Sequence, residues 1–250
     1  MRSLRTSLIA ATALLTINCG AASYRITSPS GAIAAEIIND GAISWKVSHD
    51  GREVLSKSPI SVTLTDGTVW GAGAKVSKVE KNSVSNTIAT PFSQCSSMAD
   101  RYNGITLKMK GGWSLEFRAY DDGVAYRFVS SRRKPFGITS EQVEFNFPDD
   151  FTVTVPYVRS GSDEDMQSQF FNSFENQYTV TPLSGLNPRR LAFLPLAVDA
   201  GDGLTLAITE TDLRDYPGLY LYNPDGAMSL KGKQPPYLSL IHISEPTRPY

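Results

Sequence analysis

The chain has 250 residues and a formal net charge of −1. This length allows one large β domain or two smaller domains. The sequence lacks the excess of basic residues with which proteins neutralise phosphates, which argues against nucleic-acid binding.

Residues 1–22 differ in composition from the rest of the chain. Arg2 and Arg5 precede an apolar run, residues 8–17, that is short for a bilayer-spanning helix. Small residues at 20–22 suit a cleavage site. We therefore predict a secretory signal peptide over residues 1–22, an exported (periplasmic or secreted) mature chain that begins at Ser23, and no membrane span.

The two cysteines carry separate expectations. Cys19 leaves a lipoprotein as an alternative, although Asn18 stands where a lipobox needs a small residue. After cleavage at residue 22 only Cys95 remains, and a single thiol makes no internal disulfide. We expect Cys95 to be a buried or half-buried small residue.

Hydrophobic periodicity between residues 113 and 129 has a period of two. Apolar and polar residues alternate over 113–120 and again over 124–129, which predicts two strands with one buried face. Between them, Asp121-Asp122-Gly123 is typical of a hairpin, in which Gly123 is free to take a positive φ.

Asp-Gly pairs punctuate the chain elsewhere, each between apolar or β-branched runs. They stand at residues 40–41, 50–51, 66–67, 202–203 and 225–226. Short strands at regular spacing predict an all-β, antiparallel sandwich or barrel. Residues 159–190 lack this alternation and predict a long loop system with a short strand or two. No linker divides residues 23–237, which we take as one domain.

Several chemistries are excluded by residue count and pattern. The chain lacks the cysteines and histidines of a metal cage, a phosphate-binding Gly-rich loop and a Gly-x-Ser-x-Gly nucleophile motif. His49 adjoins a predicted hairpin tip and is expected to be an exposed turn residue. The acidic run at 162–165 lacks the spacing of a calcium loop and is expected to be solvated.

Two glutamates remain as candidate site residues. Glu175 stands among aromatic and amide side chains, a composition that suits a sugar site and equally a packed loop. Glu210 follows a predicted strand at 204–208, and together with Asp212 and Asp215 it lies within a stretch of six residues. Hard cations prefer carboxylate oxygens, so this cluster is either half of a calcium site or a set of surface acids. Residues 216–219 carry Pro and Gly where a type II turn needs them.

Three segments resemble the N-terminal domain of glycoside hydrolase family 97. They are the opening Ser-Pro-Ser-Gly at 28–31 with residues 41–47 and 50–51, the hairpin FRAYDDGVAYRF at 117–128, and ITETDLRDYPGLYL at 208–221. The resemblance covers about residues 24–237. The family comprises exported α-glucosidases and α-galactosidases of Gram-negative bacteria.

This resemblance implies a β-supersandwich of the galactose-mutarotase-like kind that packs on a (β/α)₈ barrel and forms one wall of the active site. It also implies a Ca²⁺ ion held mainly by barrel glutamates, with Glu210 at the position of the ligand from this domain. Glu175 is a substrate-side candidate. The catalytic carboxylates are expected on the barrel, so no catalytic residue is assigned here, and the chain alone is expected to be inactive.

The C-terminal residues 238–250 contain LSLIHISEPTR, which resembles the translation of a sequencing adaptor. We therefore treat these residues as a non-native tail and remove His242 from any catalytic argument. A free-standing carbohydrate-binding sandwich without catalysis is the alternative function. A mutarotase-like enzyme is disfavoured because its acid–base pair usually includes histidine.

Overall fold

The computed structural model describes residues 22–92, 94–159, 165–170, 175–211, 213 and 216–236. The expectations for residues 1–21, for Asp212 and Asp215, for most of the acidic run and for the tail therefore lie outside the described residues. No helix within the described ranges is both long and apolar enough to cross a membrane.

The described residues form sixteen strands and two short 3₁₀ helices, so the predicted all-β class is confirmed. The elements are β1 (Ala22–Thr27), β2 (Ile33–Asn39), β3 (Ile43–His49), β4 (Arg52–Leu64), β5 (Val69–Trp70), β6 (Val76–Ala89), β7 (Ser97–Met109), β8 (Trp113–Tyr120), β9 (Gly123–Ser130), β10 (Ile138–Asn146), β11 (Thr152–Val155), η1 (Met166–Phe170), β12 (Thr179–Pro182), η2 (Leu183–Gly185), β13 (Leu196–Asp199), β14 (Thr205–Ile208), β15 (Tyr220–Tyr222) and β16 (Ser229–Lys233).

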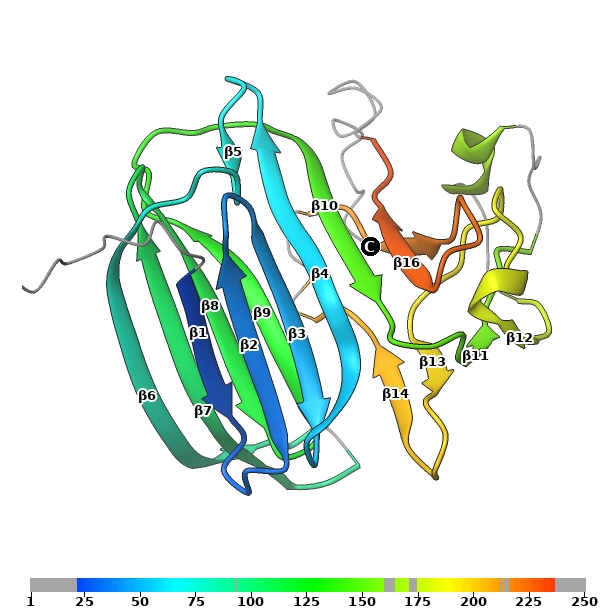
Figure 1. Ribbon diagram of the computed structural model, residues 1–250, viewed down its shortest axis with the longest axis horizontal. Coiled ribbons are helices and arrows are strands. Elements are labelled where there is room, and N and C mark those ends of the chain that lie inside the picture. Colours follow the sequence, from blue (N-terminus) through cyan, green and yellow to red (C-terminus); the bar gives the residue numbers. More distant parts are fainter. Residues whose placement is uncertain are drawn as a thin grey trace, which may run out of the picture.

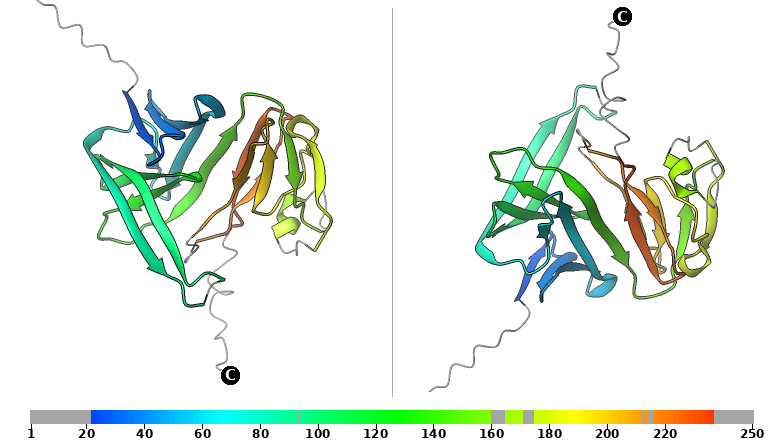
Figure 2. Two further views of the ribbon diagram at one scale, coloured as in Figure 1. Left: turned by 90° about the horizontal axis from the view of Figure 1, so that it is seen from below. Right: turned by 90° about the horizontal axis from the view of Figure 1, so that it is seen from above.

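These strands make three antiparallel sheets. The large sheet has the order β1-β2-β3-β4-β10-β16-β15, with β5 paired to β4, and the smaller sheets have the orders β6-β7-β8-β9 and β12-β11-β13-β14. Figure 1 shows β6–β9 behind the β1–β4 half of the large sheet and the other small sheet beside β16. Figure 2 shows the layers edge-on. The large sheet is thus shared between two smaller sheets, as in a sandwich extended sideways.

One apolar core runs through all three sheets. The alternation along β8 buries Leu115, Phe117 and Ala119, each at most 1% exposed. The ring of Trp45 on β3 meets Phe117 with centroids 5.7 Å apart, which ties the large sheet to the sheet of β8. Burial of such rows accounts for most of the free energy that opposes chain entropy.

The predicted hairpins are confirmed, with one correction. Asp50 and Gly51 join β3 to β4 with φ of 49° and 82°, and Asp202 and Gly203 join β13 to β14 with φ of 54° and 77°. A positive φ at both central residues is typical of a type I′ turn. Gly123, by contrast, does not have a positive φ, because it already pairs with Tyr120 as the first residue of β9.

The prediction for Cys95 was wrong, because this residue is exposed. It lies in the turn between β6 and β7, two long strands paired from Val76 to Ala89, and the Thr90 hydroxyl donates to its carbonyl oxygen. Most of β6 is exposed, so this end of the hairpin has no packed layer in which to bury a thiol.

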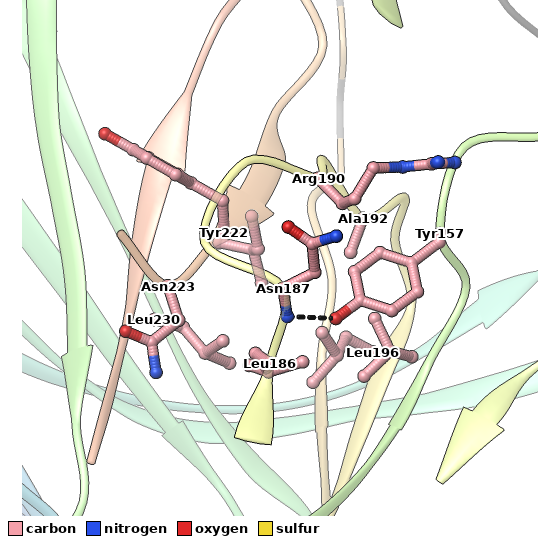
Figure 3. Close-up of a pocket in the computed structure, with 11 residues that line it drawn as sticks. Tyr157, Leu186, Asn187, Arg190, Ala192, Leu196, Tyr222, Asn223 and Leu230 are labelled. Atoms are coloured by element: carbon pink, nitrogen blue, oxygen red, sulfur yellow. Dashed lines mark hydrogen bonds between the residues drawn. The ribbon is translucent and has the colours of Figure 1, made fainter. Parts of the chain in front are cut away.

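The described residues of the region 159–190 form loops with one short strand, β12, and the two 3₁₀ helices, as predicted in outline. Its inner side packs against β15 and β16. Figure 3 shows this contact, where the backbone N–H of Asn187 donates to the hydroxyl of Tyr157 at 2.9 Å, close to Leu186, Leu196 and Leu230. Leu196 is fully buried, so these loops are anchored on the core.

Candidate functional site

A groove with a volume of about 1030 Å³ lies between the sheets. Its floor comes from the large sheet, where the side chains of Trp45, Val143 and Phe145 line it. Its two walls come from β9 of one small sheet and from β14 of the other, together with the segment that follows β14. The residues that the sequence marked in two family-like motifs therefore meet in space, although about 80 residues separate them in the chain.

The β9 wall is aromatic. Tyr126 stacks on Phe117 with centroids 5.5 Å apart and meets the edge of Trp45 at 5.4 Å. Burial raises the pKa of the Tyr126 hydroxyl, and the negative charge of Glu141 raises it further. The hydroxyl therefore stays protonated and can act as a hydrogen-bond donor in the groove.

Glu210 lies immediately after β14 and lines the groove. Its Oε1 accepts a hydrogen bond from the backbone N–H of Leu219 at 2.9 Å. The carboxylate thus links the end of β14 to the residue that precedes β15. The expected type II turn at 216–219 is not formed, because Gly218 does not have the positive φ that this turn requires. The contact between Glu210 and Leu219 organises this segment instead.

A second carboxylate, Glu141 on β10, faces the same part of the groove. Its Oε2 accepts hydrogen bonds from the hydroxyl of Tyr216 at 2.9 Å and from Nε2 of Gln234 at 3.4 Å. Burial raises the pKa of Glu141, and the charge of Glu210 adds to this effect, while the hydrogen bond from Tyr216 opposes it. Two acids with unequal environments, one from the floor and one from a wall, therefore line the same part of the groove.

The fit of these residues to a calcium ion is partial. Ca²⁺ takes six to eight oxygen ligands, usually with several carboxylates. No group of three or more His, Cys, Asp or Glu that could hold a metal is found within the described residues. Glu210 has one oxygen engaged by Leu219, and its second oxygen makes no hydrogen bond or ion pair among those residues, so it suits the role of one ligand in a shared site.

Glu175 lies apart from the groove. It is exposed, and its Oε2 lies 3.5 Å from Nη1 of Arg159, a surface ion pair of small energetic weight. The structure therefore does not bring Glu175 together with Glu210, and its substrate-side role stays a prediction. The expectation that His49 is an exposed turn residue was wrong. It is the last residue of β3, paired with Arg52 across the hairpin, and its half-buried side chain lines the groove.

Solved structures with a similar fold are glycoside hydrolases. A family 97 enzyme from Pseudoalteromonas sp. strain K8, solved in complex with acarbose, superposes with a TM-score of 0.70 at 23% identity over 84% of this chain and 32% of that chain. A β-arabinopyranosidase superposes with a TM-score of 0.71 at 18% identity, over 84% of this chain and 35% of that chain. At these identities the likeness shows the fold alone.

Sequence comparison identifies the family. The model described as Glycosyl-hydrolase 97 N-terminal matches residues 26–240, so the chain belongs to glycoside hydrolase family 97 and corresponds to its N-terminal domain. A retaining alpha-galactosidase from Bacteroides thetaiotaomicron is 49% identical over 214 residues, 86% of this chain and 32% of that protein. A probable retaining alpha-galactosidase from Streptomyces bingchenggensis is 30% identical over 45% of this chain and 18% of that protein. The chain thus spans about a third of the length of the first relative, and its match covers 18% of the second.

Proposed function

We propose that the chain is the N-terminal part of an exported, calcium-dependent retaining α-galactosidase, in which it forms a wall of the active site. The observation that carries the proposal is the 49% identity to a retaining alpha-galactosidase over nearly the whole described region. The substrate class is an α-galactoside, and a catalytic (β/α)₈ barrel supplies the reacting carboxylates.

The contacts of the two carboxylates in the groove support the proposal that this domain forms a wall and the barrel carries catalysis. Retaining hydrolysis needs a nucleophile and an acid–base carboxyl group about 5–5.5 Å apart across the glycosidic bond. Glu141 is held by Tyr216 and Gln234, and Glu210 is held by Leu219. Both groups thus serve internal contacts, which supports the proposal that the reacting carboxylates come from another part of the enzyme.

Glu210 has the role of a single calcium ligand in this proposal. When bound, the cation would supply positive charge beside the substrate. The contact with Leu219 holds the Glu210 carboxylate in one orientation before the ion arrives, which lowers the entropic cost of binding. Tyr216 and Glu141 fix the loop that precedes Leu219 on the large sheet.

The test uses the intact enzyme encoded at the source locus, with nitrophenyl α-galactoside and α-glucoside as alternative substrates. We expect turnover of the α-galactoside and loss of activity on calcium chelation that added Ca²⁺ restores. Preference for the α-glucoside would contradict the substrate assignment. An open reading frame that truly stops at residue 250, with sugar binding by this chain alone, would favour the free-standing carbohydrate-binding module instead.

Glu210 is tested by Glu210→Gln, which keeps an acceptor for the Leu219 N–H and removes the charge. We expect a weaker affinity for Ca²⁺, measured by calorimetry, by at least about tenfold for one lost carboxylate. Glu175→Gln is the matched control, because Glu175 is exposed and outside the groove. Unchanged calcium affinity in the Glu210 variant would remove this residue from the metal site.

A further inference from the structure

The carboxylate of Glu210 lies on the backbone of residues 216–220, a segment that we call the cradle. Its Oε1 accepts from the N–H of Leu219 at 2.9 Å, and a Cβ added to Gly218 would lie 3.4 Å from the same oxygen. Because this glycine carries no side chain, the carboxylate approaches the backbone without being covered. Burial raises the pKa of the Tyr220 hydroxyl, and the charge of Glu210 raises it further, which agrees with a carboxylate beside this segment.

The first end of the cradle is fixed by a hydrogen bond to the large sheet. The hydroxyl of Tyr216 donates to Oε2 of Glu141 at 2.9 Å, whereas Nε2 of Gln234 reaches the same oxygen only at 3.4 Å. Glu141 lies on β10, which pairs with β4 on one side and with β16 on the other. A hydrogen bond to a charged acceptor is stronger than one between neutral groups, so this half-buried strand residue anchors Tyr216.

The second end of the cradle is fixed by aromatic packing. Tyr220 begins β15, and its ring meets the rings of Phe170 and Phe193 with centroids 5.1 and 5.0 Å apart. Phe170 ends η1, and the neighbouring buried side chain of Gln169 donates to the carbonyl oxygen of Arg189 at 2.7 Å. The anchored loops of the region 159–190 thus brace this end of the cradle.

The middle of the cradle is short and stiff. Only Pro217 and Gly218 separate Tyr216 from Leu219, and proline fixes its own φ at about −65°. Because the other end is braced, a shift of Tyr216 is passed on to the N–H of Leu219. The hydrogen bond to Glu210 depends on the direction of that N–H, so the hold on the carboxylate depends on the anchor of Tyr216.

We propose that Tyr216 and Glu141 are positioning residues, whose hydrogen bond holds the cradle so that the N–H of Leu219 fixes the carboxylate of Glu210 with its other oxygen, Oε2, free for a cation. Both residues act through Leu219, and neither is a ligand. The role of the cation rests on the proposed function. The positioning of Glu210 is a property of this chain and holds without the metal.

The test uses the intact source-encoded enzyme after calcium chelation. Tyr216→Phe removes the hydroxyl and keeps the ring, and the readout is hydrogen–deuterium exchange at the amide of Leu219, resolved by gas-phase fragmentation. We expect exchange about 2- to 10-fold faster than in the parent, the range that one net hydrogen bond supports. Glu141→Leu should have the same effect, and the double variant should exceed neither single variant. Unchanged exchange in both single variants would overturn the proposal.

Tyr222→Phe is the matched control. It removes a hydroxyl from the same strand, β15, but Tyr222 belongs to the contact of Figure 3 and not to the groove that Glu141 lines, so exchange at Leu219 should match the parent. The amides of β8, around the buried Leu115, report the packing of the core. If these amides also exchange faster in Tyr216→Phe, the hydroxyl has a general structural role and the positioning role is wrong.

Calcium affinity, measured by calorimetry, separates this inference from the proposed function. We expect Tyr216→Phe to weaken calcium binding by about 2- to 10-fold, less than Glu210→Gln does. Weaker binding in Glu210→Gln alone would overturn the positioning role. If the amide of Leu219 is released in Tyr216→Phe and neither variant changes calcium affinity, the positioning of Glu210 stands, and the calcium role given to it by the proposed function fails.

Discussion

The substitution Phe117→Ala tests the core on which the groove is built. Phe117 is 1% exposed and packs against Trp45 and Tyr126 with centroid distances of 5.7 and 5.5 Å. Truncation of a buried Phe costs about 3–5 kcal/mol, and each aromatic contact contributes about 0.5–1.5 kcal/mol beyond burial. Because Tyr126 borders the groove and can relax into the space, we expect a loss near the middle of that range, about 4 kcal/mol.

For a domain of 150–250 residues, 1 kcal/mol shifts Tm by about 2–4 °C, so we expect Tm to fall by about 8–16 °C. Tryptophan fluorescence during thermal and urea unfolding measures this change, since Trp45, Trp70 and Trp113 are all buried. Phe92→Ala is the matched control, because Phe92 is 102% exposed and its loss should stay within about 0.5 kcal/mol. Equal effects of the two substitutions would refute the assignment of Phe117 to the shared core.

Three further predictions follow from single residues. Burial raises the pKa of Glu141 above its ordinary value of 4.5, so the folded state binds the proton more tightly and stability falls as pH rises from about 4.5 through the folded pKa. Glu141→Gln should remove this fall, giving a higher urea midpoint than the parent at neutral pH and no advantage below pH 4.5. A variant less stable than the parent at neutral pH would contradict the burial of Glu141. Cys95 should react with a maleimide as completely in the folded protein as in urea, whereas a protected thiol would place it in a core. Gly71→Ala should cost at least about 1 kcal/mol more than Gly41→Ala in urea unfolding, because both have positive φ but only at Gly71 would a Cβ lie 2.7 Å from a backbone oxygen, that of Ile60; equal losses would argue against that close approach.

The hairpin of β8 and β9 could be predicted because its signal is local. One face of β8 packs on the core, so the burial of every second residue is written directly in the sequence over 113–120. The long strands β6 and β7 could not be predicted in this way. Most of β6 is exposed, so its sequence needs no strict alternation. Its strand conformation depends instead on pairing with β7, from Ala89 with Ser97 to Val76 with Met109.

Dipeptides likewise predicted turn conformations only where the turn depends on local sequence alone. Asp50-Gly51 and Asp202-Gly203 adopt positive φ because each closes a tight hairpin between adjacent strands. Gly218 does not, since its neighbour Leu219 is held by the distant side chain of Glu210. A tertiary hydrogen bond thus overrides the local preference of Pro-Gly, and such a contact leaves no local trace in the sequence.

The candidate site shows why Glu141 was missed while Glu210 was found. Glu210 stands in a distinctive motif at the end of a strand, whereas Glu141 is a half-buried residue between the exposed Ser140 and Gln142 of β10. Only the central place of β10 in the large sheet brings Glu141 beside Tyr216 and near Glu210. Once there, its hydrogen bonds from Tyr216 and Gln234 couple the loop after β14 to the point where the chain leaves β16. The two hydrogen bonds to Glu141 therefore fix Tyr216 and Gln234 beside the large sheet. Because Tyr216 lies three residues before Leu219, whose N–H holds the carboxylate of Glu210, we expect a change at Glu141 to loosen this contact and to weaken metal binding in the intact enzyme, although Glu141 itself is not the proposed calcium ligand.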